Sequence, residues 1–147
     1  MNVSKPRLYF KMVNFYLFVS SDDYNSDTFT YNKPDDFTVD LLDLYTLESE
    51  HEIAIVDLYV KKNPLTPKDL YVFCDLCADS YVASQKHPII KWVDLRKKFP
   101  SSNHMYFPVK RGYFNKLRIY IKDKTLSHSS FPIVTSFRCV LHIRERK

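Results

Sequence analysis

The side chains best suited to chemistry in this sequence are three cysteines and a histidine in two short motifs. Cys74 and Cys77 are separated by two residues, and Cys139 and His142 have the same spacing. Three thiolates and one imidazole are a ligand set of tetrahedral zinc. Both motifs, however, fall in segments with the pattern of strands, where residues three apart point to opposite faces. Zinc is therefore the weaker alternative, and we interpret the cysteines as buried thiols.

The rest of the sequence offers no convincing catalytic arrangement. Gly112 is the only glycine, and a phosphate-binding loop needs several glycines so that the backbone can approach the anion. The five histidines are scattered, without an H-E-x-x-H spacing. Cys74 lies in an apolar run beside Asp75, whereas a nucleophilic cysteine needs an electropositive, exposed setting. We expect a protein that is not an enzyme, with no cofactor and no small-molecule substrate.

Basic residues are in slight excess and gather at 96–98, at 110–111 and at the C-terminus. The net charge is +5, from 22 Lys and Arg against 17 Asp and Glu. Such a charge permits contact with nucleic acid, although solvated strand edges explain most of these residues equally well. The candidates to face nucleic acid are the basic residues of the tail, Arg144, Arg146 and Lys147.

Length and composition favour one globular domain. The chain has 147 residues, of which 45% are hydrophobic and 16% aromatic, enough for a packed core. No apolar run approaches the ~20 residues of a membrane-spanning helix, and residues 1–10 lack the pattern of a signal peptide. We therefore expect no membrane partner. Three cysteines are too few for a disulfide framework, which indicates a reducing compartment.

Apolar residues alternate with a period of two, which predicts strands. Leu117, Ile119 and Ile121 share one face of a segment whose other face is polar. Strands are predicted at 15–20, 37–42, 52–60, 70–76, 89–93, 106–109, 116–122 and 137–144. About eight short antiparallel strands separated by Pro, Asn, Asp and Ser predict an all-β fold, a single jelly-roll β-sandwich. It would occupy residues 1–147, with 1–14 as an N-terminal arm and 145–147 as a basic tail.

Several of these segments carry motifs in a familiar order. They are FYLFVSS at 15–21, DFTVDL at 36–41, HEIAIVDL at 51–58, LYVFCDL at 70–76, HPIIK at 87–91, YFPV at 106–109, FNKLRIYIKD at 114–123 and VLHIR at 140–144. In this order they resemble the penton (minor capsid) proteins of Polinton/Maverick and adintovirus-like elements. Those proteins carry an FYVTLPS-like strand, then N-F-x-V-x-L, V-Y-V-Y-C-D-L, F-x-x-I-x-I-x-I-x-D and V-x-L-H-F-R. The resemblance covers nearly the whole chain.

The resemblance implies a structural role without enzymatic activity. Penton proteins of this kind form pentamers at the vertices of an icosahedral double-stranded DNA virus or virus-like transposon. The implied partners are further copies of the chain in a homopentamer, the major capsid protein and, without specificity, packaged DNA. The implied location is the virion, after assembly inside the host cell, in the nucleus. Ring closure needs two different patches on each subunit, with aromatic residues at the centre of the contact. The candidates are aromatic residues in or beside predicted loops, Tyr24, Phe29, Tyr31, Tyr81 and Phe107.

Two other interpretations stay open at this point. A β-sandwich could instead be a binding module that recognises nucleic acid or carbohydrate through exposed Tyr and Phe rings. Binding that weakens steeply with salt would favour nucleic acid. A domesticated host copy of the capsid domain would keep the fold and change the role.

Overall fold

The computed structural model describes residues 14–22, 33–47, 49–82, 84–100, 103–110, 112–126 and 131–146. None of these residues is helical, so the described part contains no helix that could cross a membrane. The strands are β1 (Asn14–Ser20), β2 (Asp36–Leu47), β3 (His51–Lys62), β4 (Asp69–Cys74), β5 (Ser80–Val82), β6 (Gln85–His87), β7 (Ile89–Asp94), β8 (Phe107–Pro108), β9 (Gly112–Lys122) and β10 (Val134–Glu145). The predicted all-β class is confirmed.

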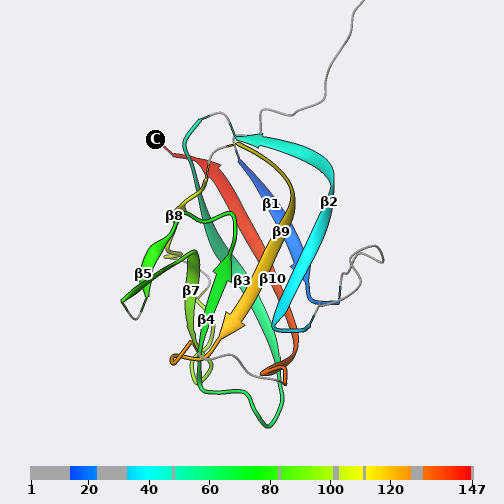
Figure 1. Ribbon diagram of the computed structural model, residues 1–147, viewed down its shortest axis with the longest axis vertical. Helices are drawn as coiled ribbons and strands as arrows, with labels where there is room; N and C mark the ends of the chain where they lie inside the picture. The colour runs from blue at the N-terminus through cyan, green and yellow to red at the C-terminus, as the bar shows by residue number, and fades with distance from the viewer. Residues whose placement is uncertain are drawn as a thin grey trace, which may run out of the picture.

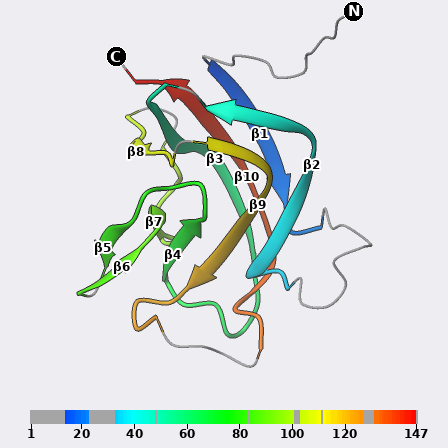
Figure 2. The same ribbon diagram turned by 45° about the horizontal axis from the view of Figure 1, so that its top comes forward.

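The strands form two four-stranded sheets and a separate hairpin (Figure 1). The first sheet has the order β1-β10-β3-β8 and the second the order β2-β9-β4-β7, while β5 pairs with β6. All these pairings are antiparallel. Figure 2 shows β2, β9 and β4 lying across β1, β10 and β3, so the two sheets face each other as a sandwich.

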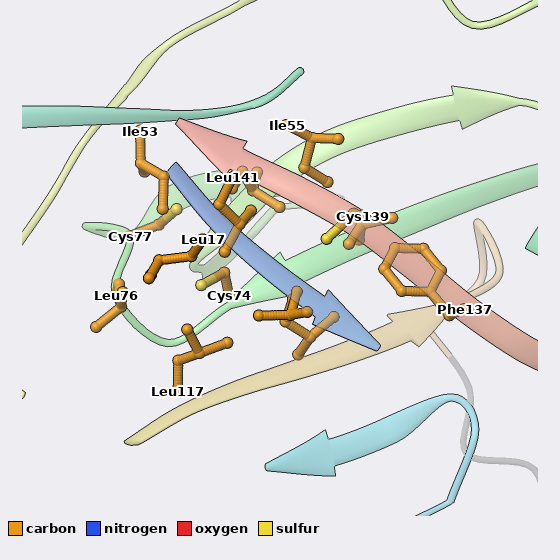
Figure 3. Packing of buried hydrophobic residues seen from close by; sticks show 14 of the residues in the cluster. Leu17, Ile53, Ile55, Cys74, Leu76, Cys77, Leu117, Phe137, Cys139 and Leu141 are labelled. Carbon is orange, nitrogen blue, oxygen red and sulfur yellow. The ribbon is translucent and has the colours of Figure 1, made fainter. Parts of the chain in front are cut away.

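Alternation along the strands sends one set of side chains between the two sheets. Leu117, Ile119 and Ile121 of β9 are buried, as their period predicts. The predicted inward face of β10, formed by Phe137, Cys139, Leu141 and Ile143, is buried too. Across the sandwich, the rings of Phe37 and Phe137 lie 6.2 Å apart. These residues belong to one continuous apolar core (Figure 3).

A β-bulge in β3 decides which residues reach the outer face of the first sheet. Asp57 pairs with Val140, but the next pair along the ladder is Ile55 with Leu141, so Val56 is an extra residue. A bulge shifts the alternation of its strand by one position. Before the bulge, the even-numbered residues Glu52 and Ala54 therefore lie on the outer face of the sheet, although Ala54 is covered there. After the bulge, the odd-numbered residues 57 and 59 lie on that face.

Each of the eight predicted segments corresponds to a strand, but the hairpin of β5 and β6 was not predicted. Each of its strands has three residues, too short to show a period. Val82, the last residue of β5, pairs with Gln85, the first residue of β6, so the chain turns between them. Ser84, in that turn, has φ of 67°, a left-handed conformation that glycine or asparagine would adopt more readily.

Candidate functional site

Of the four residues of the candidate zinc set, Cys74 and Cys77 do lie together, but His142 does not join them. Contrary to the prediction from the sequence, the first motif is not within a strand, because β4 ends at Cys74 and a turn follows, in which the N–H of Cys77 donates to the carbonyl of Cys74. Cys74, Cys77 and Cys139 are buried in the core (Figure 3), whereas His142 belongs to the outer face of β10. A hydrogen bond to Cys74, together with burial, raises the pKa of Cys77 well above its usual value, and burial does the same for Cys139. No group of three or more His, Cys, Asp or Glu side chains in the described ranges could hold a metal ion. The thiols pack as small apolar groups.

His142 is instead the centre of a polar and aromatic cluster on the outer face of the first sheet. The hydroxyl of Tyr106 and Nδ1 of His142 are hydrogen-bonded at 2.8 Å. Nε2 of the same ring bonds to Oδ1 of Asn14, and the ring of Tyr16 stacks on the imidazole with centroids 4.4 Å apart. One donated and one accepted bond fit the neutral imidazole with its proton on Nε2. Burial, followed by the charge of Arg144, lowers the pKa of His142.

The basic tail residues differ in how many contacts their side chains make within the protein. Nε of Arg144 donates to Glu52 at 2.7 Å, and its guanidinium lies 3.6 Å from the ring centroid of Tyr106. Most of its charge is thus balanced within the first sheet. Arg146 is exposed, and its backbone N–H donates to the carbonyl of Glu50. Lys147 lies outside the described residues.

Aromatic rings stand exposed on the same sheet face. Tyr16 is 55% exposed, Phe18 77% and Tyr59 48%. Phe18 pairs with Val140 of β10, and Tyr59 pairs with Arg138 of β10. We call Tyr16, Phe18, Tyr59 and Val140 the aromatic outer face. Contiguous exposed apolar groups of this kind mark interaction sites.

A shallow recess lies within this face. Its volume is about 340 Å³, and β1, β10 and β3 all line it. Phe18 and Tyr59 contribute aromatic rings, and Asp57 and Arg138 contribute one charge of each sign. The Arg138 guanidinium stacks over Tyr59 at 4.5 Å from the ring centroid. The recess offers apolar area with one acceptor and one donor group.

Sequence reasoning missed the aromatic outer face because it sought interface residues in loops. A signal was present, since the run FYLFVS at 15–20 carries aromatic residues on both faces of a strand. Among the loop candidates, Tyr81 of β5 is 75% exposed. Phe107 lies in β8, half-buried against the core. Tyr24, Phe29 and Tyr31 lie outside the described residues.

No protein-family model and no curated protein matches this chain. Two features of the molecule bear on its function. One is the order in which the strands pair, and the other is the aromatic outer face.

Proposed function

We propose that this chain is a jelly-roll vertex (penton) protein of a double-stranded DNA virus capsid or virus-like transposon, and that it assembles as a homopentamer. The pairing of strands carries the proposal. With the hairpin β5–β6 set aside, β1 pairs with β10, β2 with β9, β3 with β8 and β4 with β7. Rolling up a long hairpin of eight strands gives this first-with-last pattern, and jelly rolls of two Greek keys are common in viral capsids.

The sequence motifs support the same proposal independently of the pairing. The penton-like motifs at 15–21, 36–41, 70–76 and 114–123 coincide with β1, β2, β4 and β9. The motif at 140–144 lies in β10, which pairs with both β1 and β3. The residues that carry the resemblance are therefore those that build the sandwich.

A closed ring needs two different contact patches on each subunit. The aromatic outer face supplies the first patch, because interface centres are enriched in Tyr and Phe. The exposed ring of Tyr81, on the hairpin that leads into the second sheet, is the candidate for the second patch. In this arrangement the first sheet of one subunit meets the hairpin side of its neighbour.

Negative-stain electron microscopy of the purified chain tests the ring directly. We expect fivefold rings for the unmodified chain and their loss in Phe18→Lys, which places a charge in the aromatic outer face. Leu65→Lys is the matched control, because Leu65 is also exposed but lies in the turn after β3. Absence of rings from the unmodified chain would contradict the proposal, and rings in Phe18→Lys would contradict the assigned patch.

A second candidate function is that of a binding module for carbohydrate or nucleic acid. The recess between Phe18 and Tyr59 favours it, since the exposed rings offer a stacking surface and Asp57 and Arg138 offer polar groups. Titration with oligosaccharides and with single-stranded DNA at several salt concentrations separates the two ligands. Only DNA binding should weaken steeply as salt rises.

A further inference from the structure

The long strand β3 has an open edge. β8 pairs with β3 at Glu52 and Ile53 alone, although β3 continues to Lys62. From residue 54 onward, β10 is its one hydrogen-bonded neighbour strand among the described residues. Ala54 and Ile55 are buried, so the open part of the edge is the partly or fully exposed stretch from Val56 to Lys62. β7, at the end of the second sheet, is likewise paired on one side, with β4. Two open strand edges thus lie on the same side of the sandwich, and such edges expose unpaired N–H and C=O groups.

A groove of about 330 Å³ runs between these two strands. Leu58 and Val60 of β3 and Val93 of β7 line it with apolar groups, and Phe99 lines it from the segment after β7. Trp92 also lines the groove and is 59% exposed. The groove therefore combines an apolar lining with a large, solvent-facing indole.

The charge of the groove is positive. Lys91, Lys97 and Lys98 line it. Asp94 is the one acidic residue among the described residues that line it, and Nε of Arg96 donates to its carboxylate at 2.8 Å. The lysine charges are therefore left largely uncompensated, so a ligand with carboxylates would be complementary.

We infer that this groove binds an extended acidic segment of a partner protein, which adds as a strand to the open edge of β3. Main-chain hydrogen bonds along an edge give affinity, and alternate side chains of the added strand give specificity. In this site, apolar side chains would pack on Leu58 and Val60, and carboxylates would face the lysines. This inference does not rest on the proposed capsid role.

Single-stranded nucleic acid is the competing ligand, because it also uses an exposed aromatic ring and lysines. The peptide is favoured because the open backbone edge can hydrogen-bond an added strand and the aliphatic residues can pack against its side chains. A nucleotide would bind through stacking and phosphate contacts and would use neither feature. The test below separates the two.

Trp92 is the only tryptophan of the chain, so its fluorescence reports on the groove alone. The probe is an end-blocked octapeptide in which glutamate and valine alternate. A second peptide replaces glutamate with lysine, and a third keeps glutamate but is N-methylated at every second residue, which removes the N–H donors of one edge. An oligothymidine of similar length is the nucleic-acid probe.

We expect a saturable blue shift of Trp92 emission with the acidic peptide and a much weaker response to the other three probes. Replacing Lys97 and Lys98 together by Glu should lower the affinity for the acidic peptide by about tenfold or more, because like charges would then face each other across the contact. Lys97→Glu alone should also weaken binding, and Lys33→Glu is its control of equal charge change, because Lys33 precedes β2 at the opposite edge of the second sheet. Circular dichroism of each variant verifies that it folds.

Four results would overturn the inference. One is no emission change with the acidic peptide, and another is an equal response to the basic peptide or the N-methylated one. The third is a response to oligothymidine alone, which would assign the groove to nucleic acid. Emission that shifts only with protein concentration would assign the groove to a second copy and overturn the inference as well.

Discussion

The hydroxyl of Tyr106 and Nδ1 of His142 are joined by a hydrogen bond of 2.8 Å. Tyr106 lies directly before β8, and His142 lies in the second half of β10, so the bond connects the chain entering β8 to an inner strand of the first sheet. Burial and the charge of Arg144 lower the pKa of His142 and so favour the neutral imidazole, which can accept this bond at Nδ1 when its proton is on Nε2. The pH dependence of stability should therefore carry a signature of this residue.

His142 should make the fold less stable in mild acid. Burial and Arg144 lower its pKa in the folded state, with a further lowering from His104 and an opposing effect of Glu52. The unfolded chain therefore takes up the proton first, so stability is full above the ordinary histidine pKa of about 6.5 and falls as the pH drops through the folded pKa. Urea unfolding at a series of pH values measures this slope.

The matched variant for this prediction is His142→Gln, which cannot titrate. It should be less stable at neutral pH, because Tyr106 and Asn14 lose their partner, but its stability should depend less on pH near 6. An equal slope in both proteins would show that His142 is not the source.

The apolar core should be sensitive to loss of volume. Leu141 is fully buried between the sheets, and Leu141→Ala should lower the free energy of unfolding by about 2–5 kcal/mol, since it removes apolar contacts and leaves a cavity. Thr135→Ala, on an exposed position of the same strand, should change it by less than ~0.5 kcal/mol. Urea titration of both variants measures the difference, and equal effects would contradict the assigned faces of β10.

The three cysteines should behave as inert core residues. Their thiols are buried, and the pKa values of Cys77 and Cys139 are raised, so little thiolate forms in the native state. A thiol reagent should therefore react only as fast as the protein opens, and a zinc chelator should leave the melting temperature unchanged. Stoichiometric zinc in the purified protein, with unfolding by the chelator, would restore the metal-site hypothesis.

Local patterns predicted the framework of this fold well. The alternation of Leu117, Ile119 and Ile121 follows from burying one face of a strand, which any sheet requires. The same rule argued against zinc, because residues 139 and 142 point to opposite faces of β10. Such inferences need only the geometry of one strand.

Features that depend on long-range pairing could not be predicted in this way. The contact of Tyr16 with His142 exists because β1 pairs with β10 in one register. The outward position of Tyr59 depends on the bulge at Val56, which becomes visible only when β3 and β10 are aligned. The groove beside Trp92 exists because β8 pairs with only two residues of β3. No pattern within the sequence indicates where the pairing of β8 with β3 ends.

The mass of the purified chain in solution tests the proposed vertex role most directly. Light scattering across a concentration series should reveal a species of five times the 17.5 kDa chain mass, whose share grows with concentration. Phe18→Lys should reduce that species, and Leu65→Lys should not. A mass of one chain at every concentration would contradict the proposal that this protein assembles on its own into the vertex ring.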